Sequence, residues 1–492
     1  MESESTNLID KKERIELHDR CGCEDKETFT EAEISNQVYS VRWWVLFVCS
    51  LTIAAQCLNF VVWMPLSDSL LIAYDWDVSY VGAAAAAAAL TFVILALPVM
   101  YIIETRGLRV GMLIAGISAV LVCLFWNASL HTNAFWLFVI GSLLCGISPC
   151  ATLVVPSLLS VTWFPVTQRT TATSIGVLSV GVGSGIGYIA GPQITGPYIT
   201  AKSVLHRENL TAEYIADVTS GLQNVGYFLL AVDVIVLIMI VAYFPSAPPT
   251  PPSVAQTMGR EDFWAGLQIL KTNYQFWLLS LAFNLTNSPV YTWIPLLAVH
   301  FRNLGLDQDE ALWIAIAAAL AAGVGVFVIG LLADRPFFQR KTKRILQGFS
   351  VISIVLLLLL SLIQCEYIYI SPEALIPLLC GILICVGITT QSIFPICTEL
   401  ACEYAYPVHE GLTCTVVFML NWGISIIFLG LLLVPALSED TAWMTWVCFV
   451  GCSISLPLNI LLKDDFRRLD LDSKPKGFKE SPADNNDGNS KK

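Results

Sequence analysis

Long apolar runs separated by short polar segments dominate the chain. Each run has roughly 20 residues or more and few charges, which is the length that an α-helix needs to cross the hydrocarbon of a bilayer. Twelve such runs lie near residues 42–64, 79–103, 109–127, 134–162, 170–194, 221–243, 275–299, 310–333, 345–364, 374–400, 411–435 and 441–462. The pattern predicts an all-α membrane protein with twelve spanning helices in the lipid bilayer.

The basic residues predict how these helices are oriented. All but three of the 27 Lys and Arg residues lie in the two tails or in the segments that follow even-numbered runs. The exceptions are Lys202, Arg207 and Arg302. The positive-inside rule therefore places both termini in the cytosol. The polar first 41 residues have no signal-peptide pattern, so we expect the first run to act as a retained insertion signal.

Composition agrees with a membrane protein and excludes several other classes. Of 492 residues, 55% are hydrophobic and 13% charged, and the mean hydropathy is +0.67, which is too apolar for a soluble domain. The net charge of −12 arises largely in the tails, and no basic stripe predicts a nucleic-acid partner. The 15 cysteines lie mostly in apolar runs and indicate packing, without the paired CxxC spacing of a metal site. We expect no metal and no cofactor.

An internal repeat relates the two halves of the chain. "LLCGI" occurs at 143–147 and again at 378–382, and "FPVTQRTTAT" at 164–173 is echoed by "YPVHEGLTCT" at 406–415. "ETRGLR" after the second run is matched by "ADRPFFQRKTKR" after the eighth. These matches fall at corresponding ends of two sets of six runs. This is the parallel repeat of the twelve-helix major facilitator fold, in which two six-helix bundles related by pseudo-two-fold symmetry enclose a substrate site near mid-membrane.

The repeat divides the chain into five parts. They are a cytosolic tail, an N-terminal bundle, a cytosolic linker, a C-terminal bundle and a second tail, at 1–41, 42–243, 244–274, 275–462 and 463–492. The linker opens with the Pro-rich stretch "YFPSAPPTPPSVAQTMGRED", which predicts a segment that is neither helical nor membrane-embedded. Such a linker lets the bundles rock while limiting their separation.

Five segments carry a family resemblance: "VYSVRWWVLFVCSL", "ETRGLR", "VTWFPVTQRTTAT", "YFPSAPPTPPSVAQ" and "YPVHEGLTCTVVF". From about Val38 to about Leu469 the chain resembles the feline leukemia virus subgroup C receptor-related family, solute carrier family 49. The Pro-rich linker and the WF segment are most similar to the disrupted in renal carcinoma protein 2 branch. The resemblance implies a twelve-helix facilitator. Viral-receptor relatives carry choline and ethanolamine and were earlier linked to heme, whereas the renal-carcinoma branch is lysosomal and implicated in proton-driven pyridoxine export.

The resemblance also separates these substrates. The tryptophan that choline-carrying relatives use against the quaternary ammonium aligns with Phe60, and their two glutamines fall near Gly181 and Trp422. Because a cation prefers the tryptophan face, these changes disfavour choline. Heme is disfavoured because none of the five histidines forms a convincing pair in the cleft helices. A non-transporting receptor or scaffold is the alternative of another class, and polar residues within the runs argue against it.

Aromatic and amide side chains in three runs are the candidates for substrate binding. They are Gln56, Phe60 and Trp63 in the first run, Asn284, Asn287 and Tyr291 in the seventh, and Asn421 and Trp422 in the eleventh. Within the first and seventh runs they recur at helical spacing and so share a face. Rings and amides together suit a flat, weakly basic, hydroxylated ring. The alternative is that the rings pack or face lipid, whereas amides in hydrocarbon need a partner or a wet cavity.

Charged residues gather where the tenth run meets the eleventh, in "PICTELACEYAYPVHEG". Glu399 and Glu403 are one helical turn apart, and His409 and Glu410 directly precede the eleventh run, where a carboxylate favours the helix N-terminus. We expect a cytosolic gate. Glu399, the deepest of these acids, is also a candidate for proton coupling, and simple solvation of a loop is the remaining alternative.

The other half of the expected gate is basic. The acids can meet Arg106, Arg109, Arg169 or the cluster around Arg335 when the cytosolic side closes. Glu104 is the matching gate acid of the N-terminal half.

Asp233 lies in the middle of the sixth run, where an ionised side chain is costly. Either a structural hydrogen bond or a proton-carrying role explains it. In the fifth run, Gly176, Gly181 and Gly185 indicate close approach of helices. No nucleotide-binding or catalytic motif is found, so we expect a transporter driven by a gradient and not an enzyme.

The first tail contains a candidate sorting signal. Glu4, Leu8 and Ile9 fit the acidic dileucine pattern that clathrin adaptors recognise, which favours the lysosomal membrane over the plasma membrane. Asn209 is followed by Leu and Thr in the loop between the fifth and sixth runs and is a glycan acceptor candidate on the luminal side. We expect a monomer that works with a small solute and protons.

Overall fold

A computed structural model provides the structure of the protein. It describes residues 39–164, 168–196, 210–249, 262–301, 304, 306, 308–333, 341–365, 367–368, 370–434, 437 and 441–463. All regular elements in these residues are helices. The all-α prediction is therefore confirmed for the described chain.

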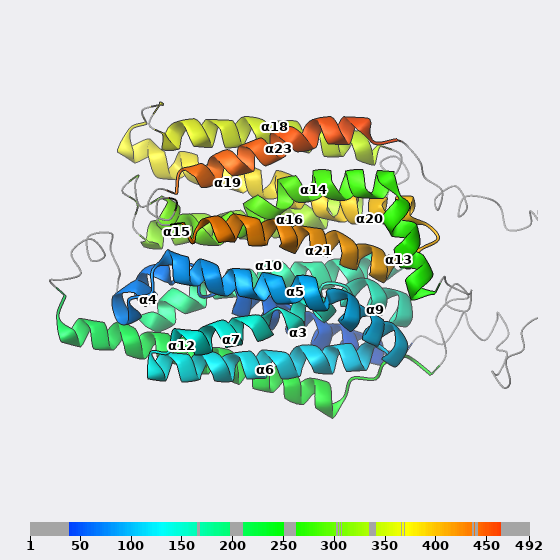
Figure 1. The fold of residues 1–492 in the computed structure, drawn as a ribbon, viewed down its shortest axis with the longest axis horizontal. Helices are drawn as coiled ribbons and strands as arrows, with labels where there is room; N and C mark the ends of the chain where they lie inside the picture. Colours follow the sequence, from blue (N-terminus) through cyan, green and yellow to red (C-terminus); the bar gives the residue numbers. More distant parts are fainter. Residues whose placement is uncertain are drawn as a thin grey trace, which may run out of the picture.

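The N-terminal half forms one bundle of long helices. Its elements are α3 (Val41–Val61), α4 (Ser67–Tyr74), α5 (Val78–Arg106), α6 (Leu108–Thr132), α7 (Phe135–Cys145), α8 (Ile147–Thr152), α9 (Val155–Trp163), α10 (Arg169–Thr195) and α12 (Ala212–Ala242). In Figure 1 these helices form the lower half of the molecule, coloured blue to green.

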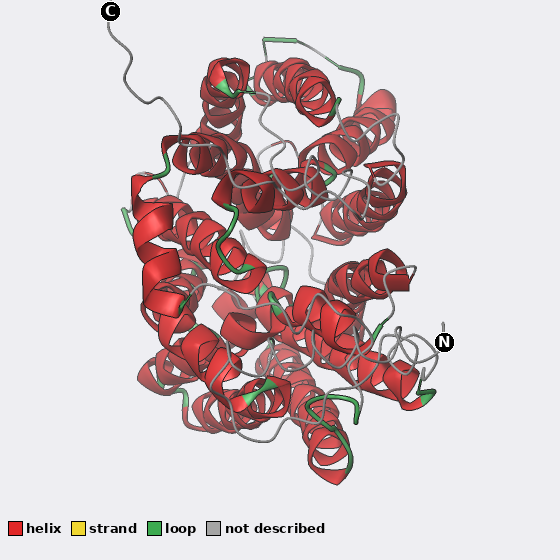
Figure 2. Ribbon diagram, turned by 90° about the vertical axis from the view of Figure 1, so that its right-hand side faces the viewer, coloured by secondary structure: helices red, strands yellow, loops and turns green. Residues whose placement is uncertain are grey.

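The C-terminal half forms the second bundle, the upper half of Figure 1. Its elements are α14 (Tyr274–Trp293), η4 (Ile294–Leu296), α15 (Leu297–His300), α16 (Gln308–Ala333), α18 (Thr342–Gln364), α19 (Pro372–Gln391), α20 (Ile393–Ala405), α21 (Glu410–Leu431) and α23 (Trp443–Leu461). The end-on view shows the two groups of helices one above the other (Figure 2).

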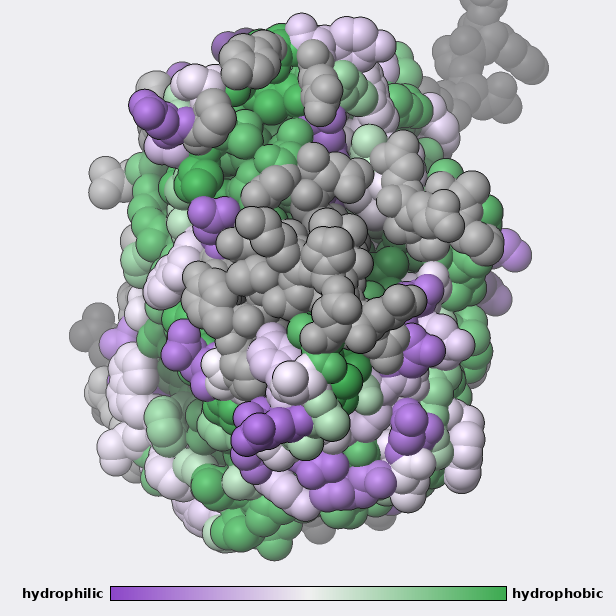
Figure 3. Space-filling model, turned by 90° about the vertical axis from the view of Figure 1, so that its left-hand side faces the viewer, coloured by the Kyte–Doolittle hydropathy of each residue, from purple (hydrophilic) through white to green (hydrophobic). Residues whose placement is uncertain are grey.

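All twelve predicted runs are helical. Ten segments of the described chain are long and apolar enough to cross a membrane, and α14 and α16 occupy the predicted seventh and eighth runs. At the end of the molecule that carries α4 and α15, hydrophilic residues are concentrated on the end face and hydrophobic residues lie along the flanks (Figure 3). This distribution fits helices that run through a bilayer from face to face.

The fourth run is not one helix but three, and Gly146 explains the first break. A Cβ on Gly146 would lie 2.1 Å from the carbonyl oxygen of Ala88 and 2.8 Å from Thr91. The turn between α7 and α8 therefore presses directly against α5, which only glycine permits. Pro149 within α8 and Pro156 at the start of α9 each lack the backbone N–H that a continuous helix needs, so the helical segments here stay short.

One helix lies in the segment that we assigned to the linker. α13 (Phe263–Thr272) buries Phe263, Gly266 and Leu270, whereas Trp264 on its other side is 61% exposed. A Cβ on Gly266 would meet Val408 at 3.1 Å, so α13 packs against the start of α21. Figure 1 shows α13 crossing the end of the bundles. The last part of the predicted linker is thus an amphipathic helix, and 250–261 lie outside the described residues.

Two helix pairs join the bundles: α5 with α21 and α10 with α16. Small residues line both contacts. A Cβ on Gly82 would lie 3.3 Å from Leu432, and one on Gly181 would lie 3.7 Å from the Cα of Gly323. The close approach of helices that we predicted from the glycines of α10 is therefore present, and at Gly181 it spans the boundary between the two halves.

Candidate functional site

Aromatic rings from both bundles meet at the centre of the boundary. Phe60 of α3 contacts Trp422 of α21 edge to face, with ring centroids 5.0 Å apart. Trp422 stacks in turn on Phe92 of α5 at 5.2 Å. Trp422 is 8% exposed, so this cluster faces the protein interior. Two of the predicted substrate residues are thus brought together across the boundary, and Phe92 joins them although no sequence signal marks it.

The helices α3 and α14 also have polar side chains on the faces that meet at the bundle boundary. Gln56, one turn before Phe60, is buried, and its Oε1 accepts a hydrogen bond from Thr152 of α8 at 3.5 Å. The hydroxyl of Tyr291 in α14 is close enough to Cys57 and Tyr188 of the other bundle to interact with them electrostatically. The boundary therefore combines aromatic faces with an amide and a phenol.

The predicted amides of α14 and α21 serve a different purpose. Asn421 Nδ2 donates to Asn284 Oδ1 at 2.9 Å, and Asn284 Nδ2 donates to the carbonyl oxygen of Val417 at 3.0 Å. One turn on, Ser288 bonds to Ser425 at 2.8 Å. These bonds tie α14 to α21 within the C-terminal bundle, so Asn284 and Asn421 have the partners that amides in hydrocarbon need.

Asn287 has a side-chain oxygen that can accept a hydrogen bond from a substrate. It is 5% exposed, and its Oδ1 has no hydrogen-bond partner among the described residues. A buried amide oxygen without a partner is costly, which makes it a candidate acceptor for a substrate hydroxyl.

Trp63 faces the interior of the N-terminal bundle. Its ring contacts Trp126 and Phe138 edge to face, with centroids 5.5 and 5.4 Å apart. All three rings line a cavity of about 30 Å³. This volume holds about two water molecules, at roughly 10–15 Å³ each, and is too small for an organic solute. Phe60 lines the same cavity, so the cavity lies between Trp63 and the contact of Phe60 with Trp422.

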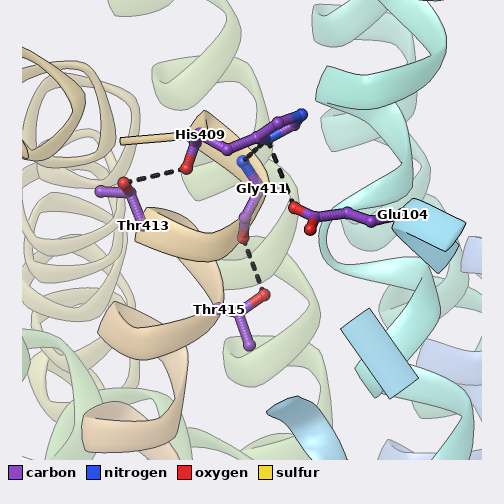
Figure 4. Close-up of polar contacts among 5 residues, drawn as sticks. All are labelled: Glu104, His409, Gly411, Thr413 and Thr415. Carbon is purple, nitrogen blue, oxygen red and sulfur yellow. Dashed lines mark hydrogen bonds and ion pairs between the residues drawn. The ribbon is translucent and has the colours of Figure 1, made fainter. Parts of the chain in front are cut away.

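An ionisable pair joins the bundles at the end where α13 lies. His409 caps the N-terminus of α21, because its Nδ1 accepts a hydrogen bond from the amide of Gly411 at 3.1 Å. The same Nδ1 lies 3.8 Å from Oε1 of Glu104, near the end of α5 (Figure 4). The two side chains are 15% and 20% exposed.

One atom of His409 therefore serves two partners. An unprotonated Nδ1 accepts the bond from Gly411, whereas a protonated Nδ1 donates to the carboxylate of Glu104. Proton binding exchanges a bond within α21 for an ion pair between the bundles.

Comparison with known proteins decides the family. The sequence profile described as "Major Facilitator Superfamily" matches residues 43–430. The chain belongs to the major facilitator superfamily. Within it, the chain is 28% identical to the solute carrier family 49 member 4 homolog of Xenopus tropicalis, over 89% of this chain and 94% of that protein. It is 24% identical to the choline/ethanolamine transporter flvcr2a of Danio rerio, over 77% of each chain.

Solved structures agree on the fold of this major facilitator protein. The crystal structure of a D-xylose-proton symporter superposes with a TM-score of 0.64 at 14% identity, covering 87% of this chain and 99% of that one. A bacterial homolog of the human lysosomal transporter Spinster, in an inward-facing and occupied conformation, gives 0.60 at 13% identity, covering 88% and 99%. The predicted resemblance to solute carrier family 49 and the predicted fold are both confirmed.

The predicted gate acids of this facilitator differ in their surroundings. On α20, Glu403 is 6% exposed whereas Glu399 is exposed, although one helical turn separates them. Glu399 and Glu410 both lie close enough to Cys402 to interact with its thiol electrostatically. Glu399 of α20 and Glu410 of α21 thus lie near the same thiol, and their role as a gate stays a prediction.

The basic residues of the predicted gate are only partly described. Arg106 is exposed, and Arg109 Nη2 donates to the carbonyl oxygen of Val241 at 3.4 Å, which ties it to α12 of its own bundle. The side chain of Arg169 and all of Arg335 lie outside the described residues, so pairing of the acids with these two arginines stays a prediction. Glu4, Leu8, Ile9 and Asn209 also lie outside the described residues.

The sequence did not reveal which groups surround Asp233. Its carboxylate accepts hydrogen bonds from Asn59 Nδ2 at 2.8 Å and from Cys123 Sγ at 3.1 Å. Asn59 is a polar residue within an apolar run, which is a signal that a search for amides in the runs would have found. The thiol carries no such signal, because most cysteines of this chain are buried packing residues.

Proposed function

We propose that this major facilitator protein is a proton-coupled transporter that exports pyridoxine from the lysosome to the cytosol. The observation that carries the proposal is the contact of Phe60 with Trp422 across the bundle boundary, beside Gln56 and Tyr291. Ring faces with hydrogen-bonding groups around them suit a flat ring that carries hydroxyl groups. Similarity to the member 4 homologs of solute carrier family 49 supports the same assignment.

Transport follows from two bundles that open to either face in turn. The small residues at the contacts of α10 with α16 and of α5 with α21 let helices slide without large repacking. At the cytosolic end, the Glu104 and His409 pair closes the mouth when the histidine is protonated and releases it otherwise. Glu399 and Glu403 belong to the same gate.

Direct flux measurement tests the proposal. Purified protein is reconstituted into liposomes loaded with labelled pyridoxine or labelled choline, with an acid or a neutral interior. We expect pyridoxine to leave faster when the interior is acid, and choline to leave at the rate of empty liposomes. Trp422→Ala should slow pyridoxine efflux, whereas Trp136→Ala, whose ring is 63% exposed away from the boundary, should not.

Other outcomes separate the alternatives. Efflux of choline without pyridoxine would favour the function named for the Danio rerio relatives. Efflux of neither solute from correctly folded protein would favour a receptor or scaffold.

The lysosomal location rests on the first tail. We propose that clathrin adaptors read Glu4, Leu8 and Ile9 in the cytosol and that Asn209 carries a luminal glycan. A tagged protein with Leu8→Ala and Ile9→Ala should move to the plasma membrane in fluorescence microscopy. Lysosomal targeting that persists in this variant would overturn the sorting assignment.

A further inference from the structure

Asp233 is a carboxylate buried inside the N-terminal bundle. It is 2% exposed at the middle of α12. Its Oδ2 accepts one hydrogen bond from Asn59 of α3 and one from Cys123 of α6. Both donors are neutral, so an ionised Asp233 keeps an uncompensated charge within the apolar part of the membrane.

The helices around α12 provide no cation near this carboxylate in the described residues. In α3, α6 and α10, the Lys, Arg and His residues lie at the helix ends: Arg42, Arg109, His131 and Arg169. The titratable groups that face Asp233 are the thiols of Cys123 and, from α7, Cys145.

The fourth helix against α12 is α4, and it contains one carboxylate, Asp68, which is buried. Tyr74 of α4 bonds to Gln223 of α12. Gln223 lies ten residues before Asp233, about 15 Å along the helix axis. The end of α4 that carries Tyr74 is therefore about 15 Å from the level of Asp233 along α12.

A small cavity lies beside the neighbours of Asp233 in the same bundle. Asn59 and Cys145, which are both close to Asp233, line the cavity of about 30 Å³ together with Trp63 and Ser142. Trp63 is 4% exposed, and its Nε1 has no hydrogen-bond partner among the described residues. A water molecule in the cavity can accept a bond from this indole and exchange protons with the hydrogen-bonded groups around Asn59.

We propose that Asp233 binds and releases the coupled proton, with water in this cavity as its route, and that Asn59 passes the change to the bundle boundary. The inference deepens the proposed function and rests on it in one respect: the proton at Asp233 is coupled to transport only if the protein is a proton-coupled transporter. In the ionised state, Asp233 accepts from Asn59 and Cys123. After protonation, the carboxyl group gains an O–H donor and loses its charge, so the bonds from Asn59 and Cys123 weaken and the contact between α3, α6 and α12 loosens.

Asn59 is the sequence neighbour of a residue at the boundary between the bundles. Asn59 precedes Phe60, whose ring contacts Trp422 of the opposite bundle. A shift of α3 that accompanies the proton therefore moves the aromatic contact at the candidate substrate site. The proton is taken up from water as the carboxyl O–H bond forms and is returned to water when that bond breaks.

Infrared titration tests the proton site without any substrate. The carbonyl stretch of a protonated carboxyl group is followed in nanodisc-reconstituted protein as the pH is lowered from neutral to lysosomal values. We expect a band in the wild type and in Asp217→Asn, the exposed carboxylate of the same helix, that is absent from Asp233→Asn. An unchanged set of bands in Asp233→Asn overturns the proposal.

A second variant covers the case in which Asp233→Asn does not fold. Asn59→Leu removes a donor to the ionised form only, so the midpoint of the titration should move to higher pH. A midpoint equal to that of the wild type would contradict the proposal, because loss of a donor to the ionised carboxylate must raise the pKa of the group that titrates if that group is Asp233.

Transport measurements separate this inference from the proposed function. Asp233→Asn should lose the efflux of pyridoxine that an acid interior accelerates, yet retain exchange of labelled for unlabelled pyridoxine without a gradient. Wild-type protein that moves no pyridoxine defeats the proposed substrate but leaves the infrared result to decide on Asp233. Acid-accelerated efflux that is equal in Asp233→Asn and in the wild type overturns the inference alone.

Discussion

At the residue scale, single atoms with two possible partners provide the means for switching. His409 Nδ1 is placed to accept from Gly411 or to donate to Glu104, and only its proton decides between them. Asp233 Oδ2 accepts from both Asn59 and Cys123, and we propose that protonation of the carboxylate changes these bonds. The first group lies at an end of the molecule and the second in its interior, so gating and proton binding are assigned to different places.

Substitution of the two gate residues tests whether they act as a pair. His409→Asn keeps an N-cap for α21 but cannot be protonated, and Glu104→Gln removes the charge of its partner. We expect each to change pyridoxine efflux by up to about fivefold, which corresponds to roughly 1 kcal/mol for a partly exposed ion pair. The double variant should differ from the wild type no more than either single variant. Additive effects would show that the residues act independently.

The amide pair of the C-terminal bundle has a structural prediction. Asn284→Ala and Asn421→Ala each remove one partner of a buried hydrogen bond, and their double-mutant cycle should give a coupling of roughly 0.6 to 1.7 kcal/mol. The unfolding free energy in detergent is the measurement. Asn127, which donates to the carbonyl of Gly226 in the other bundle, serves as a control partner whose cycle with Asn421 should be additive. A coupling of zero between Asn284 and Asn421 would contradict the bond.

At the element scale, apolar runs predicted where helices lie but not how they are divided. All twelve runs are helical, because length and apolarity alone decide whether a segment can cross a bilayer. The breaks around α8 depend on the contact of Gly146 with Ala88 in another helix, which no local pattern contains. The amphipathic α13 was missed because its 10 residues are too few to span a bilayer and follow a Pro-rich stretch.

Local sequence patterns also predicted only part of the candidate site, because they contain no information on contacts between helices. The polar and aromatic residues were recognisable one by one, as Phe60, Trp422 and Asp233 show. Their partners depend on how the helices are rotated against each other. Asn421 donates to Asn284 and Asp233 accepts from Asn59, while substrate binding by the two amides stays a prediction.

A glycine in α10 gives the clearest test of helix packing. A Cβ on Gly183 would lie 2.1 Å from the carbonyl oxygen of Ala54 in α3. Gly183→Ala must therefore push α10 away from α3, and we expect a loss of about 1–3 kcal/mol in unfolding free energy. Gly423→Ala in α21, where the added Cβ meets nothing within 4 Å, should be neutral or gain up to about 1 kcal/mol. Equal stability of the two variants would contradict the packing.

At the scale of the whole molecule, two bundles meet mainly along two helix pairs, α5 with α21 and α10 with α16, and each bundle has hydrogen bonds of its own. The aromatic contact includes the first pair, because Trp422 of α21 stacks on Phe92 of α5, and Phe60 joins it from α3, which packs against α10 of the second pair. Rigid bundles that pivot about these pairs expose the contact first to one face and then to the other. The gate and the proton site have a function only if the bundles move in this way.

Spin-label distances at both ends of the molecule test that claim most directly. One pair of labels replaces Thr105 and Tyr406 at the end that carries the gate, and a second replaces Thr132 and Tyr367 at the opposite end, after exposed native thiols such as Cys385 are changed to serine. When pyridoxine is added and the pH is lowered, we expect one distance to lengthen while the other shortens. Distances that stay fixed at both ends, in protein that transports, would contradict it.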